Sequence, residues 1–312
     1  MVRPCIVLLI AANAAQSAGL KDFAGTWAMR LGERNLFVLT LAPQGEAIQG
    51  GLDRPARFSS NNSIFANMRG GVRHDTVVRS RVADGVLHLT IRNMDDAKDE
   101  DSYAMVLNGK RAELTPDDLP AGVVVQPYAF ERAPAGVTVA TDWEPNRAYV
   151  PGDSDAPNPE MKAIFDEDQR VRSTDHTDWS VVGKTDAERR AQTRALLAAG
   201  ALHTGKDYEE AAFVFQHGDS PPDYLLAHTL AMVAVSKGDA TAIWIAAATL
   251  DRYLEHIKQK QIFGTQSNSD PQSKWTQEPY DRDLVSDALR RQLGVPPQSV
   301  QAEQLKSYQS QH

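Results

Sequence analysis

The chain has 312 residues and a formal net charge of −8, with 42% hydrophobic and 24% charged residues, which is the composition of an ordinary globular protein. The acidic balance excludes the basic surface that nucleic-acid binding requires. The length predicts about two domains.

The first residues have the features of a bacterial secretory signal peptide. Arg3 precedes an apolar run at residues 6–12, and small residues follow that run. The run is much shorter than the roughly 20 residues of a membrane-spanning helix, and no later stretch reaches that length. We therefore expect residues 1–18 to be a cleaved leader and the mature protein to be periplasmic or secreted, without a membrane span. The only cysteine, Cys5, lies in this leader, so the mature chain should contain neither a disulfide nor a thiolate nucleophile.

Residues 19–133 are predicted to form short strands separated by turns. Polar and apolar residues alternate in the later half of residues 86–92, which is the period of a half-buried strand. Asp84-Gly85 and Asn108-Gly109 tolerate positive φ and therefore favour hairpins. The domain should be all-β, an antiparallel barrel or sandwich of about eight strands. The strands expected by pattern are 26–31, 35–41, 77–82, 86–91, 103–107 and 123–130.

Gly25-Thr26-Trp27 opens the first predicted strand. This sequence resembles the Gly-x-Trp opening of lipocalins. The resemblance implies a lipocalin-like barrel in which Trp27 closes the base. The alternative is that Trp27 is an ordinary core residue.

Residues 134–157 are rich in Pro, Gly and Asp and have no sustained hydrophobic period, which predicts a linker. Trp143 and Tyr149 within it are expected to pack against a domain as anchors.

Residues 158–312 are predicted to form an all-α domain with antiparallel helix hairpins and a polar C-terminal tail. The first helix begins at Asn158-Pro159-Glu160, where Asn is the N-cap and Pro the first helical residue. Its apolar face changes to polar at Asp168, and Arg172 lies one turn further, so the two can form an ion pair. Thr185-Asp186-Ala187-Glu188 has the pattern of a capping box, which predicts a helix start there. The short connection 237–239 predicts a hairpin of two helices.

His217 ends a helix that is apolar on all sides and is therefore expected to be buried. Gly218 after it is a natural C-cap, and Asp219 or Ser220 can act as the N-cap of the next helix. Helix-capping roles thus explain most of the residues in this segment. The helix C-terminus favours the imidazolium and burial favours the neutral ring, so the sequence leaves the protonation of His217 open.

This domain contains several short polar motifs: Asn158-Pro-Glu-Met161, Asp168-Gln169, Gln216-His217-Gly-Asp219, Leu250-Asp251-Arg252 and Gln261-x-x-Gly264-Thr265-Gln266. Together they resemble a bacterial helical domain of unknown function over residues 158–266. The resemblance implies an all-α fold whose hallmark polar residues gather in one place, and it implies no established activity. The hallmark residues are Asp168, Gln169, Gln216, His217, Asp251, Arg252, Gln261 and Gln266.

Two functions are compatible with these residues. In the first, the protein binds a ligand or partner in the cell envelope: the β domain holds an apolar small molecule or a partner, the helical domain docks another envelope protein, and the polar residues form a satisfied internal network. The absence of a complete catalytic set favours this hypothesis slightly.

The alternative is a hydrolase-type enzyme in which His217 is the general acid or base, oriented by Asp168, Asp219 or Asp251. No nucleophile motif accompanies it. A metal-dependent version through His217, Asp219 and His228 matches no standard zinc spacing, so no metal or cofactor is predicted. Candidate substrate-binding residues are Gln169, Arg172, Gln216, Arg252, Gln261, Thr265 and Gln266.

Overall fold

The computed structural model describes residues 18–61, 64–96, 98–117, 126–152, 154–173, 179–269 and 275–311. The chain forms two compact units, Met1–Ser63 with Met68–Pro145 and Ile64–Asn67 with Asn146–His312. The predicted leader lies outside the described residues up to residue 17, and so does Cys5. None of the helices described is both long enough and apolar enough to span a bilayer.

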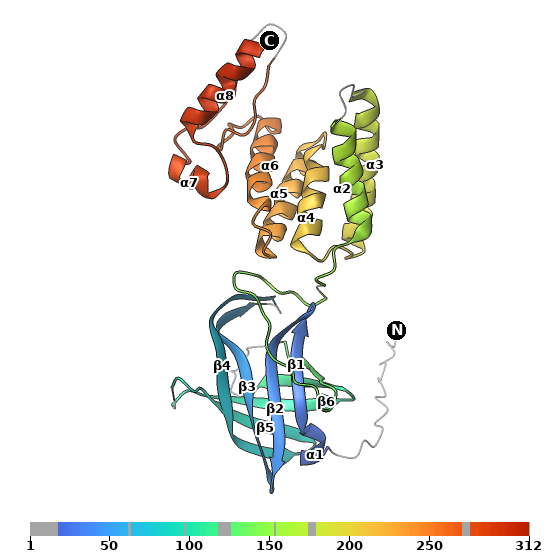
Figure 1. Cartoon of the computed structure of the whole chain (residues 1–312), viewed down its shortest axis with the longest axis vertical. Helices are drawn as coiled ribbons and strands as arrows, with labels where there is room; N and C mark the ends of the chain where they lie inside the picture. Colours follow the sequence, from blue (N-terminus) through green and yellow to red (C-terminus); the bar gives the residue numbers. More distant parts are fainter. Residues whose placement is uncertain are drawn as a thin grey trace, which may run out of the picture. The chain divides into compact units, whose positions relative to one another are not determined.

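The first unit contains a closed antiparallel barrel in which each strand pairs with its sequence neighbours and β8 pairs with β1 (Figure 1). This confirms the predicted all-β antiparallel fold and selects the barrel over the sandwich. The strands are β1 (Gly25–Leu31), β2 (Arg34–Gln44), β3 (Ala47–Asn61), β4 (Ile64–Ala83), β5 (Val86–Arg92), β6 (Glu100–Asn108), β7 (Arg111–Pro116) and β8 (Tyr128–Arg132). The sequence pattern missed β3 and β7. It also placed a strand at 123–130, of which residues 123–125 lie outside the described part and, of the rest, only 128–130 are extended.

Trp27 lies at one end of the barrel interior and is fully buried. Its indole nitrogen donates a hydrogen bond of 2.9 Å to the carbonyl of Phe23, in the short helix α1 (Leu20–Phe23) that precedes the barrel. The Arg132 guanidinium lies 4.0 Å from the centroid of the Trp27 ring and donates to the carbonyls of Asp22 and Ala24. Indole, guanidinium and helix α1 thus contact one another at this end, and Trp27 is a buried core residue.

The first part of the segment that follows β8 packs against the barrel. Asp142 and Asn35 exchange two hydrogen bonds, from Asn35 N to the Asp142 carboxylate at 2.5 Å and from Asp142 N to the Asn35 carbonyl at 3.1 Å. Tyr149, in the second unit, is fully buried and forms an isolated bridge with Phe65. Tyr149 is therefore an anchor, as expected, and Trp143 is half-buried.

The second unit is helical, which confirms the predicted fold class. Its helices are α2 (Pro159–Arg172), α3 (Trp179–Ala198), α4 (Gly205–Gln216), α5 (Pro221–Ser236), α6 (Ala242–His256), α7 (Asp287–Gln292) and α8 (Gln298–Gln311) (Figure 1). Asn158 is the N-cap of α2, and its side chain accepts from the backbone N–H groups of Glu160 and Met161. The predicted helix start at Thr185 is wrong: α3 already begins at Trp179, and the Thr185 hydroxyl donates to the Val182 carbonyl inside it.

Candidate functional sites

The C-terminal end of α4, where His217 follows, is fixed by three other helices. The carbonyls of residues 216–218 accept hydrogen bonds from Arg252 of α6 at 2.8 Å, Arg190 of α3 at 2.8 Å and Tyr224 of α5 at 2.5 Å, in that order. The last carbonyls of a helix have no intrahelical partner and carry partial negative charge, so guanidinium groups suit them. The backbone at His217 is thereby fixed.

The side chain of Asp168 is the centre of a buried polar network. It is only 1% exposed, and it accepts from Arg172 Nη1 at 2.8 Å and from Gln169 Nε2 at 2.9 Å. His217 Nδ1 lies 3.2 Å from Asp168 Oδ2, and the His217 side chain is 18% exposed. Arg189 Nε lies 3.3 Å from Asp168 Oδ1 without hydrogen-bond geometry. Four of the predicted site residues therefore meet here: Asp168, Gln169, Arg172 and His217.

Asp186 of α3, which was not among the predicted site residues, completes this network. Arg172 Nη2 bonds both of its carboxylate oxygens at 2.7 Å, and Arg189 Nη2 lies 2.5 Å from Oδ1. Burial raises the pKa of Asp186, but the hydrogen bonds from Arg172 and Arg189 outweigh burial and hold the pKa below its usual value. Two carboxylates thus balance two guanidinium groups beside the imidazole.

Asp219 belongs to a separate group of ion pairs. Its side chain is 80% exposed and lies 3.1 Å from Arg190 Nη2. Asp223 receives Arg194 Nη2 at 2.5 Å and the Ser220 hydroxyl at 2.8 Å. Within the part of the chain that the structure describes, Asp219 forms no hydrogen bond or ion pair with the His217 ring.

Asp251 anchors a loop. It is fully buried, and its carboxylate accepts from the backbone N–H groups of residues 262, 263 and 265 at 2.8, 3.0 and 3.0 Å, and from the Thr265 hydroxyl at 2.8 Å. The Gln261 side chain donates to the carbonyls of Gln266 and Gln277 and accepts from Gln266 N. The polar groups of these side chains are therefore already used in hydrogen bonds within this loop region. Asp251, Gln261, Thr265 and Gln266 form a second cluster, which is connected to the α4 terminus through Arg252.

Arg252 makes that connection. Its Nε donates to Gln266 Oε1 at 3.1 Å, while its Nη1 bonds the Gln216 carbonyl. Burial lowers its pKa. Gln216 thus takes part in this connection through its backbone carbonyl.

The inner face of the barrel changes character from one end to the other. Strand register places Trp27, Leu39 and Leu52 on the same, inward face. Around them the inward side chains are apolar and almost fully buried: Leu87, Leu89, Met105, Leu114 and Phe130. Towards the other end of the barrel, the inward-facing positions of the strands hold Phe37, Arg54, Phe58, Arg73, Asp75, Asp101, Tyr103 and Tyr128. Among these, Phe37 and Asp75 are buried, and the others are partly or largely exposed.

Asp75 pairs with two arginines in this polar half. Arg54 Nε lies 2.7 Å from Asp75 Oδ2, and Arg73 contacts both carboxylate oxygens, with Nε 2.8 Å from Oδ1 and Nη2 2.9 Å from Oδ2. The side chains of Arg54 and Arg73 are 14% and 11% exposed, whereas that of Asp75 is 1% exposed. Arg54 Nη2 also lies 3.6 Å from Asp101 Oδ2, whose side chain is 51% exposed. One buried carboxylate therefore faces two guanidinium groups.

Aromatic rings adjoin this charged group. Phe37 and Phe58 pack edge to face with centroids 5.1 Å apart, and Tyr128 lies 6.0 Å from Phe37. Burial first, and then the charge of Asp101, raise the pKa of Tyr103 far above its usual value, and burial raises the pKa of Tyr128 as well. Both phenols therefore stay protonated at neutral pH. This site does not follow from the sequence pattern, because its inward positions depend on the register of β3 and β4.

No protein-family model matches the chain, and searches of the curated proteins and of the solved structures find no match either. The lipocalin-like character of the first unit thus rests on its closed barrel and on Trp27. The comparisons give no support to the resemblance of residues 158–266 to a helical domain of unknown function.

Proposed function

We propose that this protein is an exported binding protein whose barrel takes a small acidic molecule with an aromatic body into the polar half of its interior. One observation carries the proposal: the inward positions change from apolar and buried to charged, aromatic and partly exposed along the same strands. Eight-stranded barrels can hold one small ligand, and ligand sites combine apolar walls with a few placed polar groups.

The charges of this half favour an anion. Asp75 can neutralise only one of its two arginines, and the further contact of Arg54 is to the half-exposed Asp101 at 3.6 Å. A ligand carboxylate can replace Asp101 and receive charge-assisted hydrogen bonds from Arg54. The protonated Tyr103 hydroxyl donates to Asp101 Oδ2 at 3.5 Å and can donate to a ligand carboxylate that replaces Asp101. The Phe58 ring lies 5.7 Å from the Arg54 guanidinium and so adjoins the same position.

The helical network supports a structural role for the predicted catalytic residues. A general base needs a carboxylate that orients its imidazole, but Asp168 makes shorter contacts with Arg172 and Gln169 than with His217. Asp251 is fully occupied by its loop. We therefore propose that the helical unit uses these residues to fix its own packing, and we rank the His217 enzyme below the binding protein.

Calorimetric titration of the full chain with phenylbutyrate and with the neutral phenylbutanol tests the proposed function. The acid should bind and the alcohol should bind at least about tenfold more weakly, since an uncharged hydroxyl cannot form an ion pair or a bidentate contact with Arg54. Arg54→Gln should remove this preference, whereas Arg57→Gln, a neighbouring exposed arginine with the same change of charge, should retain it.

Asp101→Asn gives a test that a folding defect cannot imitate. Removal of the competing carboxylate should tighten phenylbutyrate binding several-fold, because Arg54 then lacks an anionic neighbour at the exposed side. Weaker or unchanged binding of the acid to Asp101→Asn, or equal binding of acid and alcohol to the wild type, would contradict the proposal.

A further inference from the structure

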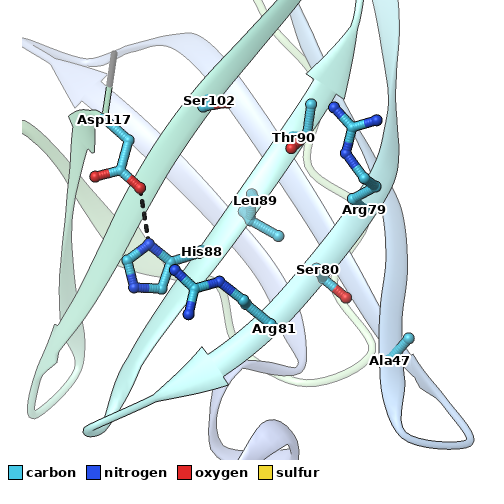
Figure 2. A pocket seen from close by; sticks show the side chains of 9 residues that line it. All are labelled: Ala47, Arg79, Ser80, Arg81, His88, Leu89, Thr90, Ser102 and Asp117. Carbon is cyan, nitrogen blue, oxygen red and sulfur yellow. Dashed lines mark hydrogen bonds and ion pairs between the residues drawn. The ribbon is translucent and has the colours of Figure 1, made fainter. Parts of the chain in front are cut away.

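A pocket with a volume of about 560 Å³ lies on the outer face of the barrel, over β4, β5 and β6 (Figure 2). Its outward direction follows from β5, where Leu87, Leu89 and Ile91 fill the interior and the alternating residues point away from it. It is therefore separate from the polar half of the interior. The lining residues are Ala47, Arg79, Ser80, Arg81, His88, Leu89, Thr90, Ser102 and Asp117.

One wall is a histidine held by a carboxylate. Figure 2 shows Asp117 bonded to His88, with 2.7 Å between Oδ2 and Nδ1. Asp117 is itself fixed, because its backbone N–H donates to the Ser102 carbonyl at 2.8 Å. The side chains of His88 and Asp117 are 27% and 39% exposed. The imidazole therefore has a defined orientation at the edge of the pocket.

The two arginines differ in what they already bind. Arg79 is committed to Glu100, with Nη2 2.6 Å from Oε2. Arg81, the cross-strand partner of His88, makes no ion pair or hydrogen bond through its guanidinium to any residue that the structure describes. Arg81 is thus a cation available to a ligand at this wall.

Two hydroxyl groups line the same pocket as Arg81. Thr90 and Ser102 are a cross-strand pair on β5 and β6, and Thr90 is also the partner of Arg79. Neither hydroxyl makes a side-chain hydrogen bond within the described ranges. A guanidinium and two hydroxyls without partners, in one pocket, form a set of donors that suits an oxyanion.

We propose that this pocket binds a small polar molecule with an oxyanion group, a phosphorylated or carboxylated sugar. Arg81 contacts the oxyanion, and Thr90 and Ser102 donate to its oxygens or to sugar hydroxyls. The volume lies in the range of small-molecule sites, about 300–1,000 Å³, and is far larger than a single inorganic anion needs. Most of the lining residues have polar side chains, but the wall also offers apolar surface, so the pocket suits a body with hydroxyl groups and apolar faces, as a sugar has.

Calorimetric titration of the full chain with glucose phosphate, glucuronate and glucose tests this site. At least one of the two anions should bind, and glucose should bind at least about tenfold more weakly, because charge-assisted hydrogen bonds supply most of the affinity. Binding of the phosphate alone would assign a phosphate ester, and binding of glucuronate alone would assign a carboxylate.

Arg81→Gln should weaken anion binding at least about tenfold, and Ser102→Ala about threefold, with an unchanged melting temperature since Arg81 is exposed and the Ser102 hydroxyl has no side-chain hydrogen bond within the described residues. Arg57→Gln is the matched control for charge and should bind as the wild type does. Arg54→Gln should also leave this binding intact, which separates the outer pocket from the interior site. The proposal is overturned if neither anion binds, if glucose binds as tightly as the anions, or if Arg81→Gln and Arg57→Gln behave alike.

Discussion

Asp168 lies 3.2 Å from His217 Nδ1 but 2.8 Å from Arg172 Nη1, so the carboxylate makes its shorter contact with the guanidinium. Arg172 in turn bridges to Asp186. Buried ion pairs of this kind are costly to break from one side, because the remaining charge has no compensation. The contact with His217 is the weaker part of the network, and the two side chains should therefore differ in their effect on stability.

Asp168→Ala should lower the free energy of unfolding by about 3–5 kcal/mol, since Arg172 and Arg189 lose a buried counter-charge. His217→Ala should cost only about 1–2 kcal/mol, the range of a modest hydrogen bond and some packing. Urea denaturation of both variants checks this order. Asp219→Ala, at an exposed residue, is the control and should cost less than about 1 kcal/mol. A larger loss for His217→Ala than for Asp168→Ala would contradict the network described here.

Asp186 should make the helical unit sensitive to acid. Burial raises its pKa, but the Arg172 and Arg189 hydrogen bonds lower it by more, so the pKa in the folded state lies below the usual value of an aspartate. Such a group stabilises the folded state above its unfolded pKa, and the stabilisation is lost as the pH falls through the folded pKa. Asp186→Asn should therefore be less stable than the wild type near pH 7, and the difference should shrink below about pH 4. Melting curves from about pH 3 to pH 7 measure this, and a constant difference over that range would contradict it.

Glu210 should have the opposite dependence. It is 3% exposed, and its Oε2 has no hydrogen-bond partner in the part of the chain that the structure describes. Burial raises its pKa above 4.5, so the folded state favours the protonated carboxyl, and stability is lost as the pH rises through the folded pKa. Glu210→Gln should therefore raise the melting temperature near pH 7 and lose this advantage below about pH 4.5. An advantage that is largest at acid pH would show that the orphaned carboxylate is not the cause.

Turn residues helped to predict some of the strands, although β7 was missed despite the Asn108-Gly109 turn that precedes it. Asp84 and Gly85 both have positive φ in the hairpin between β4 and β5, as their sequence predicted. β3 was missed because it contains Gly50, Gly51 and Pro55, which ordinarily weaken a strand. Gly50 is required there: a Cβ at this position would lie 1.8 Å from the Thr40 carbonyl oxygen of β2. The close approach of two backbones, which local sequence does not reveal, explains this residue.

The helical site was partly predictable for a similar reason. The spacing of Asp168 and Arg172 on one helix predicted their ion pair. Asp186 and Arg189 were missed because Thr185-Asp186-Ala187-Glu188 has the pattern of a helix start, although it lies inside α3. Only the packing of α2 against α3 brings Asp186 to Arg172. Contacts between elements decide which polar residues meet, and they are not encoded in local spacing.

The hydrogen bonds between Asp251 and the loop at residues 262–265 allow a test of whether Asp251 has a structural or a catalytic role. Its carboxylate accepts three backbone N–H groups and one hydroxyl with two oxygens, and an amide offers only one acceptor oxygen. Asp251→Asn should therefore cost about 2–4 kcal/mol of unfolding free energy, because at least one buried donor loses its partner. Hydrogen exchange should accelerate at the amides of residues 262, 263 and 265, while the amides of α2 keep their protection. Asp251→Asn with unchanged stability and unchanged exchange at these amides would remove the anchor role and leave the carboxylate available for chemistry.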